Sequence, residues 1–560
     1  MNAFVALNTA PFAIGSPIFP DTTLQELAKK SGSLAAWQAA FAKKGAMAAK
    51  DVIGHFSVGL RDAQGRVFLA VDRFAVDTVC YRVVGSQIAF STRADDLANA
   101  DTPIDPQAIY DYLFFHAIPS PRTIFKGVCR LPPGHSAVFE NGELTVSAYW
   151  VPEFAESKNP DFESLKREFR ELLRNSVADE LDGGKAACFL SGGTDSSTVA
   201  GMILEAGKTP AATYSIGFDA AGYDEMEFAR LAAKRFNTEH HEYYVTPEDL
   251  VRSIADVAGS YDQPFGNSSA LPAYYCAKMA KDDGVTKILA GDGGDELFGG
   301  NSRYAKQRVF GWYNVLPGAV RTGLMEPLME LPFMAKIPLL SKGASYVEQA
   351  KVPMPDRLNM YNLLLRLGIA DVLTNDFLAQ VDTTSPAQHQ RAVWAQAKTS
   401  HALNRTLAFD WRYTLAESDL PKVCGTTRLA GIGVGFPMLS AQLLDFSLKL
   451  PTEYKLKGFK LRWFFKEALR GFLPDEILAK KKQGFGLPFG VWATRHDGLK
   501  KLAVDSLYSL SQRGIVRADF IETLVKKRLP EHPGYYGEMV WILMMLEQWL
   551  QAKAPLFKLR

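Results

Sequence analysis

The sequence predicts a two-domain protein that combines an antiparallel β domain with an α/β domain built on a parallel sheet. Up to about residue 150, the chain consists of short alternating segments separated by turn formers. After Pro152, apolar strand-like runs alternate with helix-like segments, which is typical of a doubly wound parallel sheet with helices on both faces. The 560 residues, 47% of them apolar, are enough to bury more than one core.

The first predicted domain covers residues 1–152 and is mostly antiparallel β structure. Period-two alternation predicts three strands, at residues 55–62, 66–73 and 87–93. A hairpin is expected within 131–150, with Asn141 and Gly142 at its turn. Residues 23–46, which precede the strands, have a helical pattern.

The second predicted domain covers residues 160–555, where strands and helices alternate. The predicted helices are 163–181, 196–207, about 224–236 and 247–260. The predicted strands are 186–190, 212–218, 240–245 and 287–291. The remainder, about 300–560, is rich in Leu, Ala, Lys and aromatic residues at helical spacing, so we expect helices packed around the sheet.

Charge and cysteine usage exclude several classes of protein. The 63 Lys and Arg residues nearly balance 61 Asp and Glu residues, so we expect neither a nucleic-acid nor a membrane partner. The five cysteines are odd in number and lack C-x-x-C spacing, which argues against a disulfide framework or structural zinc. The first 20 residues match a signal peptide poorly, because they lack a basic region and Pro11 and Pro17 interrupt the apolar run, so we expect none. No uninterrupted apolar run reaches about 18 residues, so we expect no membrane-spanning helix. We therefore expect a cytoplasmic protein with a small-molecule or peptide substrate.

A Gly/Ser-rich loop, Ser191 to Ser197, joins a predicted buried strand to a predicted helix. Its glycines, hydroxyls and N–H groups, together with the helix N-terminus, favour a phosphate ligand. Asp195 would repel phosphate unless a divalent cation lay between them, so Mg²⁺ is implied with the nucleotide. The loop lacks a Walker A lysine, and Phe189 stands where a nucleophile elbow needs glycine. A purely structural turn is the alternative, which the complete S-G-G-T-D-S-S sequence disfavours.

A second Gly-rich loop, Gly291 to Gly300, follows the predicted strand at 287–291. Its carboxylates, Asp292, Asp295 and Glu296, should face the same sheet edge as the first loop, because ligands gather at the carboxyl ends of parallel strands. A solvated turn is the simpler interpretation. Two Gly-rich loops at matching strand ends favour a metal and proton-transfer site instead.

Three motifs in register, SGGTDSS, GYDEMEFAR at 222–230 and GDGGDELFGG, resemble the synthetase domain of class B asparagine synthetases. The first motif is similar to the pyrophosphate-binding loop of N-type ATP pyrophosphatases, and relatives include β-lactam synthetases and lasso-peptide cyclases. The similarity continues through LPPGH and YW in 131–150 and through 473–490. It implies a HUP-like ATP pyrophosphatase domain after a degenerate, Ntn-hydrolase-like glutaminase β-sandwich. It also implies ATP and Mg²⁺ as cosubstrate and cofactor, with AMP and pyrophosphate as products.

The resemblance assigns roles to individual residues. Those expected to hold the ATP phosphates are Ser191, Gly192, Gly193, Asp195 and Ser196. Those expected to line the nucleoside are Phe189, Leu190, Ile216, Gly217 and Gly291. Asp195 and Asp295 would bind Mg²⁺, and Asp292 takes the place of the general base that deprotonates the incoming amine. Lys482 matches the lysine that stabilises charge on the acyl-adenylate and the departing phosphate.

The sequence departs from the family pattern in two places. Position 2 is Asn where glutamine-hydrolysing relatives carry a nucleophilic Cys, so we expect no glutaminase activity and a nitrogen donor that is ammonia or an amine. In the segment 420–440, four charged family residues are replaced by Cys424, Gly425, Gly433 and Gly435. This loss of charge and bulk favours a carboxylate larger or less polar than aspartate.

Together these patterns predict an ATP-dependent, AMP-forming ligase that joins a carboxylate to ammonia or an amine. Intramolecular ring closure is the first alternative, because cyclising relatives also lack the nucleophile. A nucleotide-binding pseudoenzyme is the alternative from another class, and the presence of Asp195, Asp292, Asp295 and Lys482 argues against it. The resemblance is also compatible with a homodimer.

Overall fold

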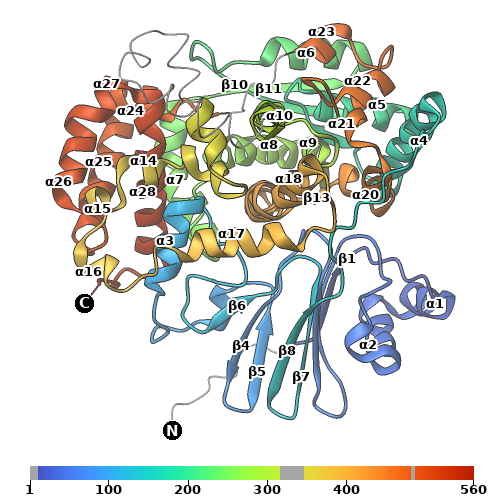
Figure 1. Ribbon diagram of the computed structural model, residues 1–560, viewed down its shortest axis with the longest axis horizontal. Coiled ribbons are helices and arrows are strands. Elements are labelled where there is room, and N and C mark those ends of the chain that lie inside the picture. Colours follow the sequence, from blue (N-terminus) through green and yellow to red (C-terminus); the bar gives the residue numbers. More distant parts are fainter. Residues whose placement is uncertain (1–9, 316–345, 481–485, 560) are drawn as a thin grey trace.

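The chain folds into a β-sandwich domain followed by a larger domain built around a parallel sheet (Figure 1). The computed structural model describes residues 10–315, 346–480 and 486–559. The strands of the first domain lie on one side of the molecule, and helix α17 (Ser385–Gln396) runs along the boundary with the helix-rich second domain. The predicted fold class is therefore confirmed at the level of its two kinds of sheet.

Two antiparallel sheets form the first domain. The five-stranded sheet contains β1 (Phe12–Gly15), β2 (Phe56–Arg61), β3 (Val67–Val71), β7 (His135–Glu140) and β8 (Glu143–Ala148), in that order. The three-stranded sheet has the order β5 (Gln87–Ser91), β4 (Cys80–Val84), β6 (Val128–Arg130). Leu69, Tyr81 and Phe90 belong to the core between them. Strands β2, β3 and β5 confirm the three predicted strands, whereas β1, β4, β6 and helix α3 (Pro106–Phe115) had no clear sequence signal.

Two helices pack on the outer face of the five-stranded sheet. They are α1 (Thr22–Ser31) and α2 (Ser33–Lys44), where the sequence predicts one continuous helix. The helix breaks at Gly32, whose φ of 88° lies in the left-handed region that glycine adopts readily. Trp37 of α2 contacts Phe56 with ring centroids 4.9 Å apart, so the second helix is anchored by aromatic packing.

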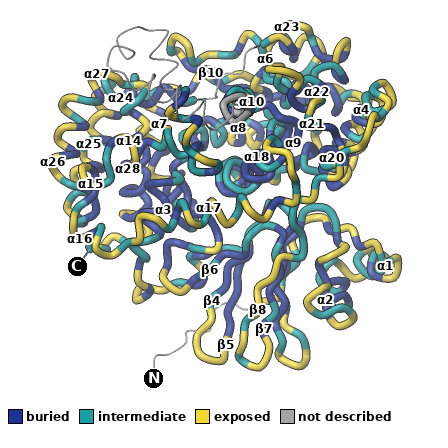
Figure 2. Tube along the Cα trace, viewed as in Figure 1, coloured by how far each residue is buried: buried dark blue, intermediate teal, exposed yellow. Residues whose placement is uncertain are grey.

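The second domain contains a five-stranded parallel sheet. Its order is β11 (Glu239–Val245), β10 (Ala212–Phe218), β9 (Ala187–Phe189), β12 (Lys287–Leu289) and β13 (Gly433–Gly435). One face is covered by α7 (Pro247–Ser260), α8 (Ala270–Asp282) and the largely buried α28 (Pro533–Lys553), which Figure 2 shows in dark blue. The other face is covered by α4 (Phe162–Glu180), α5 (Thr194–Gly207) and α6 (Met226–Phe236). The predicted strands and helices of this sheet are confirmed, except that β13 was not expected.

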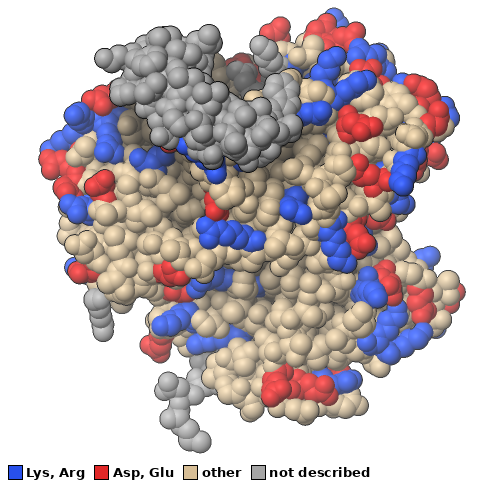
Figure 3. Space-filling model, viewed as in Figure 1, with Lys and Arg blue, Asp and Glu red and all other residues tan. Residues whose placement is uncertain are grey.

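The remaining described residues are mostly helical, as predicted for residues 300–560. The longer helices are α10 (Ser302–Val315), α18 (Ala402–Asp410), α19 (Leu420–Ala430), α20 (Ala441–Lys449) and α25 (Asp497–Ser511). A small hairpin of β14 (Leu456–Lys457) and β15 (Lys460–Leu461) leads into α22 (Trp463–Ala468). None of the helices in the described ranges is both long and apolar enough to cross a membrane. On the face shown in Figure 3, both signs of charge are interspersed.

The strand order places a crevice between β9 and β12. From β9 the chain builds outward through β10 to β11 on one side, and later through β12 and β13 on the other. The loops that follow β9 and β12 therefore leave in opposite directions. Ligands bind at such a switch point in doubly wound sheets, and both Gly-rich loops lie there.

Candidate functional site

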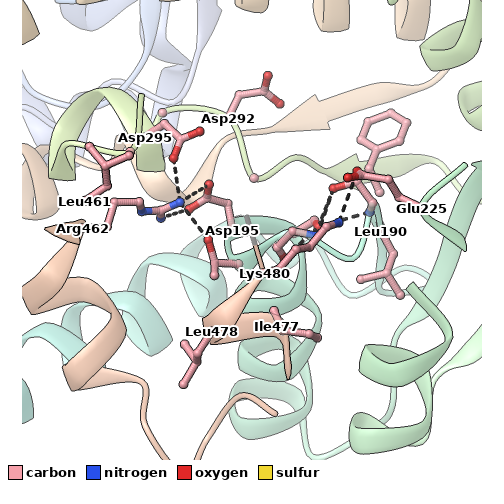
Figure 4. Close-up of a pocket in the computed structure, with 18 of the residues that line it drawn as sticks. Leu190, Asp195, Glu225, Asp292, Asp295, Leu461, Arg462, Ile477, Leu478 and Lys480 are labelled. Carbon is pink, nitrogen blue, oxygen red and sulfur yellow. Dashed lines mark hydrogen bonds and ion pairs between the residues drawn. The ribbon is translucent and has the colours of Figure 1, made fainter. Parts of the chain in front are cut away.

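A cavity of about 1090 Å³ opens at the carboxyl ends of β9 and β12. Both Gly-rich loops line it, and segments from much later in the chain, Phe459–Lys466 and Ile477–Lys480, close another wall. Figure 4 shows six of the charged residues that line this cavity: Asp195, Glu225, Asp292, Asp295, Arg462 and Lys480. The volume suits a nucleotide together with a second substrate.

The loop after β9 presents phosphate-binding groups to the cavity. Helix α5 begins at Thr194 and has no side-chain cap. Gly193, Thr194 and Asp195 line the cavity, so the first N–H groups of the helix and its dipole are available to an anion there. The hydroxyl of Ser196 accepts a hydrogen bond of 3.1 Å from the Ser191 N–H. Of the predicted phosphate residues, Gly192 alone does not line the cavity. A Cβ at Gly192 would lie 2.4 Å from the backbone nitrogen of Ala229, so this glycine lets the loop pack on α6.

The predicted nucleoside residues form one wall, with one exception. Phe189, Leu190, Ile216 and Gly291 line the cavity. Gly217 does not, because it packs under the ring of Tyr244. Gly291 brings the two loops into contact, since a Cβ there would lie 2.8 Å from the Ser196 nitrogen.

The structure brings Asp195 and Asp295 together through one arginine. Arg462 donates 2.7 Å hydrogen bonds from Nη1 to Asp195 Oδ2 and to Asp295 Oδ1 (Figure 4). Its side chain is only 5% exposed. Burial lowers the pKa of Arg462, but the charges of the two aspartates outweigh burial and raise this pKa above its usual value. The arginine is therefore a permanent cation between the two carboxylates.

This pair of carboxylates fits the predicted magnesium site. Carboxylate oxygens from two loops converge, and they already hold a cation in the form of the Arg462 guanidinium. Hard oxygen donors of this kind are the ligands that Mg²⁺ prefers. Glycines create the room, since a Cβ at Gly300 would lie 1.6 Å from Asp295 Oδ1 and one at Gly294 2.1 Å from Asp195 Oδ1.

Asp292 belongs to a separate ionic cluster in the same cavity. Lys422 Nζ lies 3.2 Å from Asp292 Oδ1 and 3.2 Å from Asp419 Oδ1. Burial raises the pKa of Asp292, and the charge of Lys422 partly offsets this effect. Burial also disfavours the charged form of Lys422, but the two carboxylates prevail and raise its pKa. A carboxylate with a raised pKa is suited to proton transfer near neutral pH.

The predicted catalytic Lys482 lies outside the described residues. Its neighbour Lys480 is described and lines the cavity. Lys480 Nζ lies 3.2 Å from Glu225 and 4.4 Å from the centroid of the Phe228 ring. Lys480 Nζ also donates a 3.5 Å hydrogen bond to the carbonyl oxygen of Gly192, so this lysine reaches the phosphate loop.

Sequence reasoning did not identify Arg462, Lys480, Asp419 and Glu225 as site residues. Glu225 lies inside the GYDEMEFAR motif, which could have indicated it. Lys480 lies inside the segment 473–490, which carries part of the family resemblance and could have indicated it. Arg462 and Asp419 have no local signal, because only the tertiary fold brings them to the two loops.

The four replaced positions of the segment 420–440 do not line the cavity, whereas Lys422 and Val423 do. Cys424 points toward the first domain, with Sγ 3.5 Å from the carbonyl oxygen of Val76. A Cβ at Gly425 would lie 2.3 Å from the Tyr261 ring, so an aromatic side chain fills this position. Gly435 is filled in the same way by Glu180 and Leu289. Neighbouring side chains therefore fill the space beside Gly425 and Gly435. The expectation of a substrate larger or less polar than aspartate stays a prediction.

Sequence comparisons match both domains. Residues 168–551 match the profile described as Asparagine synthase, and residues 36–150 match that described as Glutamine amidotransferase domain. Asparagine synthetase [glutamine-hydrolyzing] 1 of Bacillus subtilis (strain 168) is 25% identical over 76% of this chain and 66% of its own length. Asparagine synthetase [glutamine-hydrolyzing] 3 of the same organism is 24% identical over 75% of this chain and 64% of its own length.

A relative with a different name also matches. Amidase chyE of Penicillium rubens is 22% identical over 78% of this chain and 70% of its own length. The chain thus spans about two thirds of the length of these relatives. Two of the three carry the asparagine synthetase name, and the third does not.

Proposed function

Because the chain belongs to the asparagine synthase family, we propose that it is an ATP-dependent ligase that forms carbon–nitrogen bonds. It adenylates a carboxylate, releases pyrophosphate and transfers the acyl group to ammonia or an amine. The observation that carries this proposal is the meeting of three groups in one cavity: the uncapped N-terminus of α5, the Asp195–Asp295 pair, and Asp292. The finer fold assignments belong to the same proposal: an Ntn-type domain at 1–152 and a HUP-like domain at 160–555.

At the phosphate end, the N–H groups of the Ser191–Ser196 loop and the α5 N-terminus bind the β- and γ-phosphates. Phe189 and Ile216 cover the nucleoside, because they form the apolar wall next to this loop. Asp195 and Asp295 hold Mg²⁺, which when bound neutralises phosphate charge. Lys482, by its resemblance, stabilises the negative charge that develops as pyrophosphate leaves.

At the acceptor end, Asp292 takes the proton of the incoming amine, which attacks only in its neutral form. Lys422 holds this carboxylate in position through its 3.2 Å contact. Asp419 holds the other side of the same lysine. Proton removal and phosphate binding are thus performed by two separate ionic clusters.

We also propose that the first domain does not hydrolyse glutamine. Hydrolysis by a cysteine needs a thiolate in an accessible, electropositive environment. Burial raises the thiol pKa of Cys80 and also that of Cys129, the two cysteines of this domain. The nitrogen donor is therefore ammonia, an amine carried by a substrate, or ammonia supplied by another protein.

The experiment that tests the proposal measures the nucleotide products. Purified full-length protein receives Mg-ATP, ammonium and a panel of carboxylic acids including aspartate, and AMP and pyrophosphate are separated from ADP and phosphate. We expect AMP and pyrophosphate that depend on one acid and disappear in Asp195→Ala. Asp445→Ala, an exposed carboxylate outside the cavity, is the matched control. Bound ATP without pyrophosphate for any acid would instead favour a pseudoenzyme, and ADP would contradict the proposed chemistry.

A further inference from the structure

Arg462 occupies the space between the two carboxylates of the proposed metal site. It follows the β14–β15 hairpin and precedes α22, so it reaches the Gly-rich loops from a distant part of the chain. Besides Asp195 and Asp295, it donates a 2.8 Å hydrogen bond to Thr194 Oγ1 at the start of α5. Its Cζ lies 3.9 Å from the centroid of the Phe465 ring. The guanidinium group of Arg462 thus donates hydrogen bonds to the same carboxylate oxygens that would have to bind a divalent cation.

The same arginine is held in a costly arrangement. Its φ of 54° lies in the left-handed region, which side chains other than glycine rarely adopt. Its Nε is buried and has no hydrogen-bond partner among the described residues. The compensating contacts are those to the two carboxylates, to Thr194 and to Phe465. Loss of the carboxylate contacts would therefore leave Arg462 held only by Thr194 and Phe465.

We propose that Arg462 and a divalent cation compete for the Asp195–Asp295 pair, so that the metal enters together with the nucleotide and not alone. This inference rests on the proposed function, because it assigns the cation to the nucleotide site. A metal that binds first must displace charge-assisted hydrogen bonds and face an unscreened guanidinium in a buried site. The phosphates of a nucleotide provide an alternative partner for the displaced arginine, since Thr194 opens the helix that faces them.

A neighbouring lysine supports the same picture. Lys466 lies one helical turn after Arg462 and also lines the cavity. Burial is the main cause that lowers the pKa of Lys466; the charge of Arg462 lowers it further, and the charge of Asp295 opposes both. A second basic side chain thus lies close enough to Arg462 for their charges to interact.

The test titrates Mn²⁺ as a spectroscopic substitute for Mg²⁺ and follows free Mn²⁺ by electron paramagnetic resonance. Wild type, Arg462→Met and Arg462→Lys are compared without nucleotide and with a non-hydrolysable ATP analogue. We expect Arg462→Met to bind Mn²⁺ alone at least about tenfold more tightly than wild type. In wild type, the analogue should tighten Mn²⁺ binding by a similar factor. Arg462→Lys, which keeps the charge but loses the two-pronged geometry, should fall between the two.

Arg470→Met is the matched control, because Arg470 lines the same cavity but pairs with Glu467 and Asp475 instead. It should leave the affinity for Mn²⁺ alone unchanged. Adding Asp195→Asn to Arg462→Met should abolish the gained binding, which locates it at this site.

Equal Mn²⁺ affinity in wild type and a folded Arg462→Met would overturn the competition. If Arg462→Met does not fold, wild type alone decides the question. The competition would be overturned if wild type bound Mn²⁺ tightly without nucleotide and the ATP analogue did not tighten this binding. Either result leaves acid-dependent release of pyrophosphate intact, so failure of the inference is distinguishable from failure of the proposed ligase. Absence of Mn²⁺ binding under every condition would contradict both.

Discussion

Buried cations in this protein differ in how their charge is balanced. Lys422 lies between two carboxylates, and Arg462 also contacts two. Lys455 is fully buried but has a neutral partner, the Asn404 Oδ1 at 3.1 Å, and lies 4.9 Å from the centroid of the Phe154 ring. Burial accordingly lowers the pKa of Lys455 to about 7, although the charge of Glu156 opposes this shift. The stability of the fold should therefore depend on pH through this residue.

Lys455→Met should remove that dependence. An unfolded lysine titrates near pH 10.4, so between pH 7 and 10 the unfolded chain binds more protons and wild type gains stability as pH rises. Burial of the charged form of Lys455 destabilises the fold. This destabilisation is absent above the pKa that the lysine has in the unfolded chain and complete below its pKa in the folded protein, where it amounts to at most about 5 kcal/mol. Melting temperatures of both proteins at pH 6.5 and 9.5 test this. The melting temperature of the variant minus that of wild type should be larger at pH 6.5 than at pH 9.5. The same difference at both pH values would contradict a role for the charge of Lys455.

Lys422→Met should shift the pH dependence of amide formation. The charge of Lys422 counteracts the rise that burial causes in the pKa of Asp292, so its removal raises this pKa further. A general base works only when ionised, and the acid limb of the rate profile should therefore move to higher pH. Lys422→Arg, which keeps the charge, should shift the limb less. An acid limb at the same pH in Lys422→Met would contradict the role given to Asp292.

At the scale of elements, the two Gly-rich loops fit together only because specific glycines leave room for carboxylates. Gly300→Ala would place a methyl group 1.6 Å from Asp295 Oδ1 and must push that side chain away from Arg462. Overpacking of this kind costs about 1–3 kcal/mol. We expect a lower melting temperature and at least about tenfold weaker binding of Mg-ATP. Gly207→Ala in α5, where the nearest atom would lie 3.6 Å away, is the control. It should leave Mg-ATP binding unchanged and should not lower the melting temperature, because alanine favours a helix more than glycine does.

The sequence is informative wherever an element carries its own pattern. Strands β9, β10, β11 and β12 and the loops after β9 and β12 follow from apolar runs and glycines, and their meeting follows from the parallel topology. Strand β13 has only three residues, two of them glycine, and is defined solely by pairing with β12. Arg462 is hidden for the same reason, since its role depends on contacts across the whole domain. The pattern of neighbouring residues thus predicts the two Gly-rich loops, but it does not predict that the side chain of Arg462 lies between them.

At the scale of the whole molecule, a buried ionic cluster joins the two domains. Glu417, in the π-helical segment Trp411–Asp419, accepts hydrogen bonds from Arg130 of the first domain and Arg412 of the second. Ser120 of the first domain donates to the same carboxylate through its N–H at 3.0 Å and its hydroxyl at 2.9 Å. Since this segment ends at Asp419, which contacts Lys422 in the cavity, the interface and the site share one element.

Glu417→Gln should loosen the two domains. The side chains of Arg130 and Glu417 are 9% and 4% exposed, so removal of the carboxylate charge leaves two buried guanidinium groups without their counter-charge. Breaking one side of such a buried cluster costs about 3–5 kcal/mol. Differential scanning calorimetry should show a lower melting temperature and a separation of the two domain transitions.

Asp445→Asn is the control, because it removes another ion pair between the domains, the one that Asp445 forms with Arg73. That carboxylate is 55% exposed, so its loss should cost less than about 1 kcal/mol. If both substitutions lowered the melting temperature equally, or neither did, buried charge at Glu417 would not be what couples the domains.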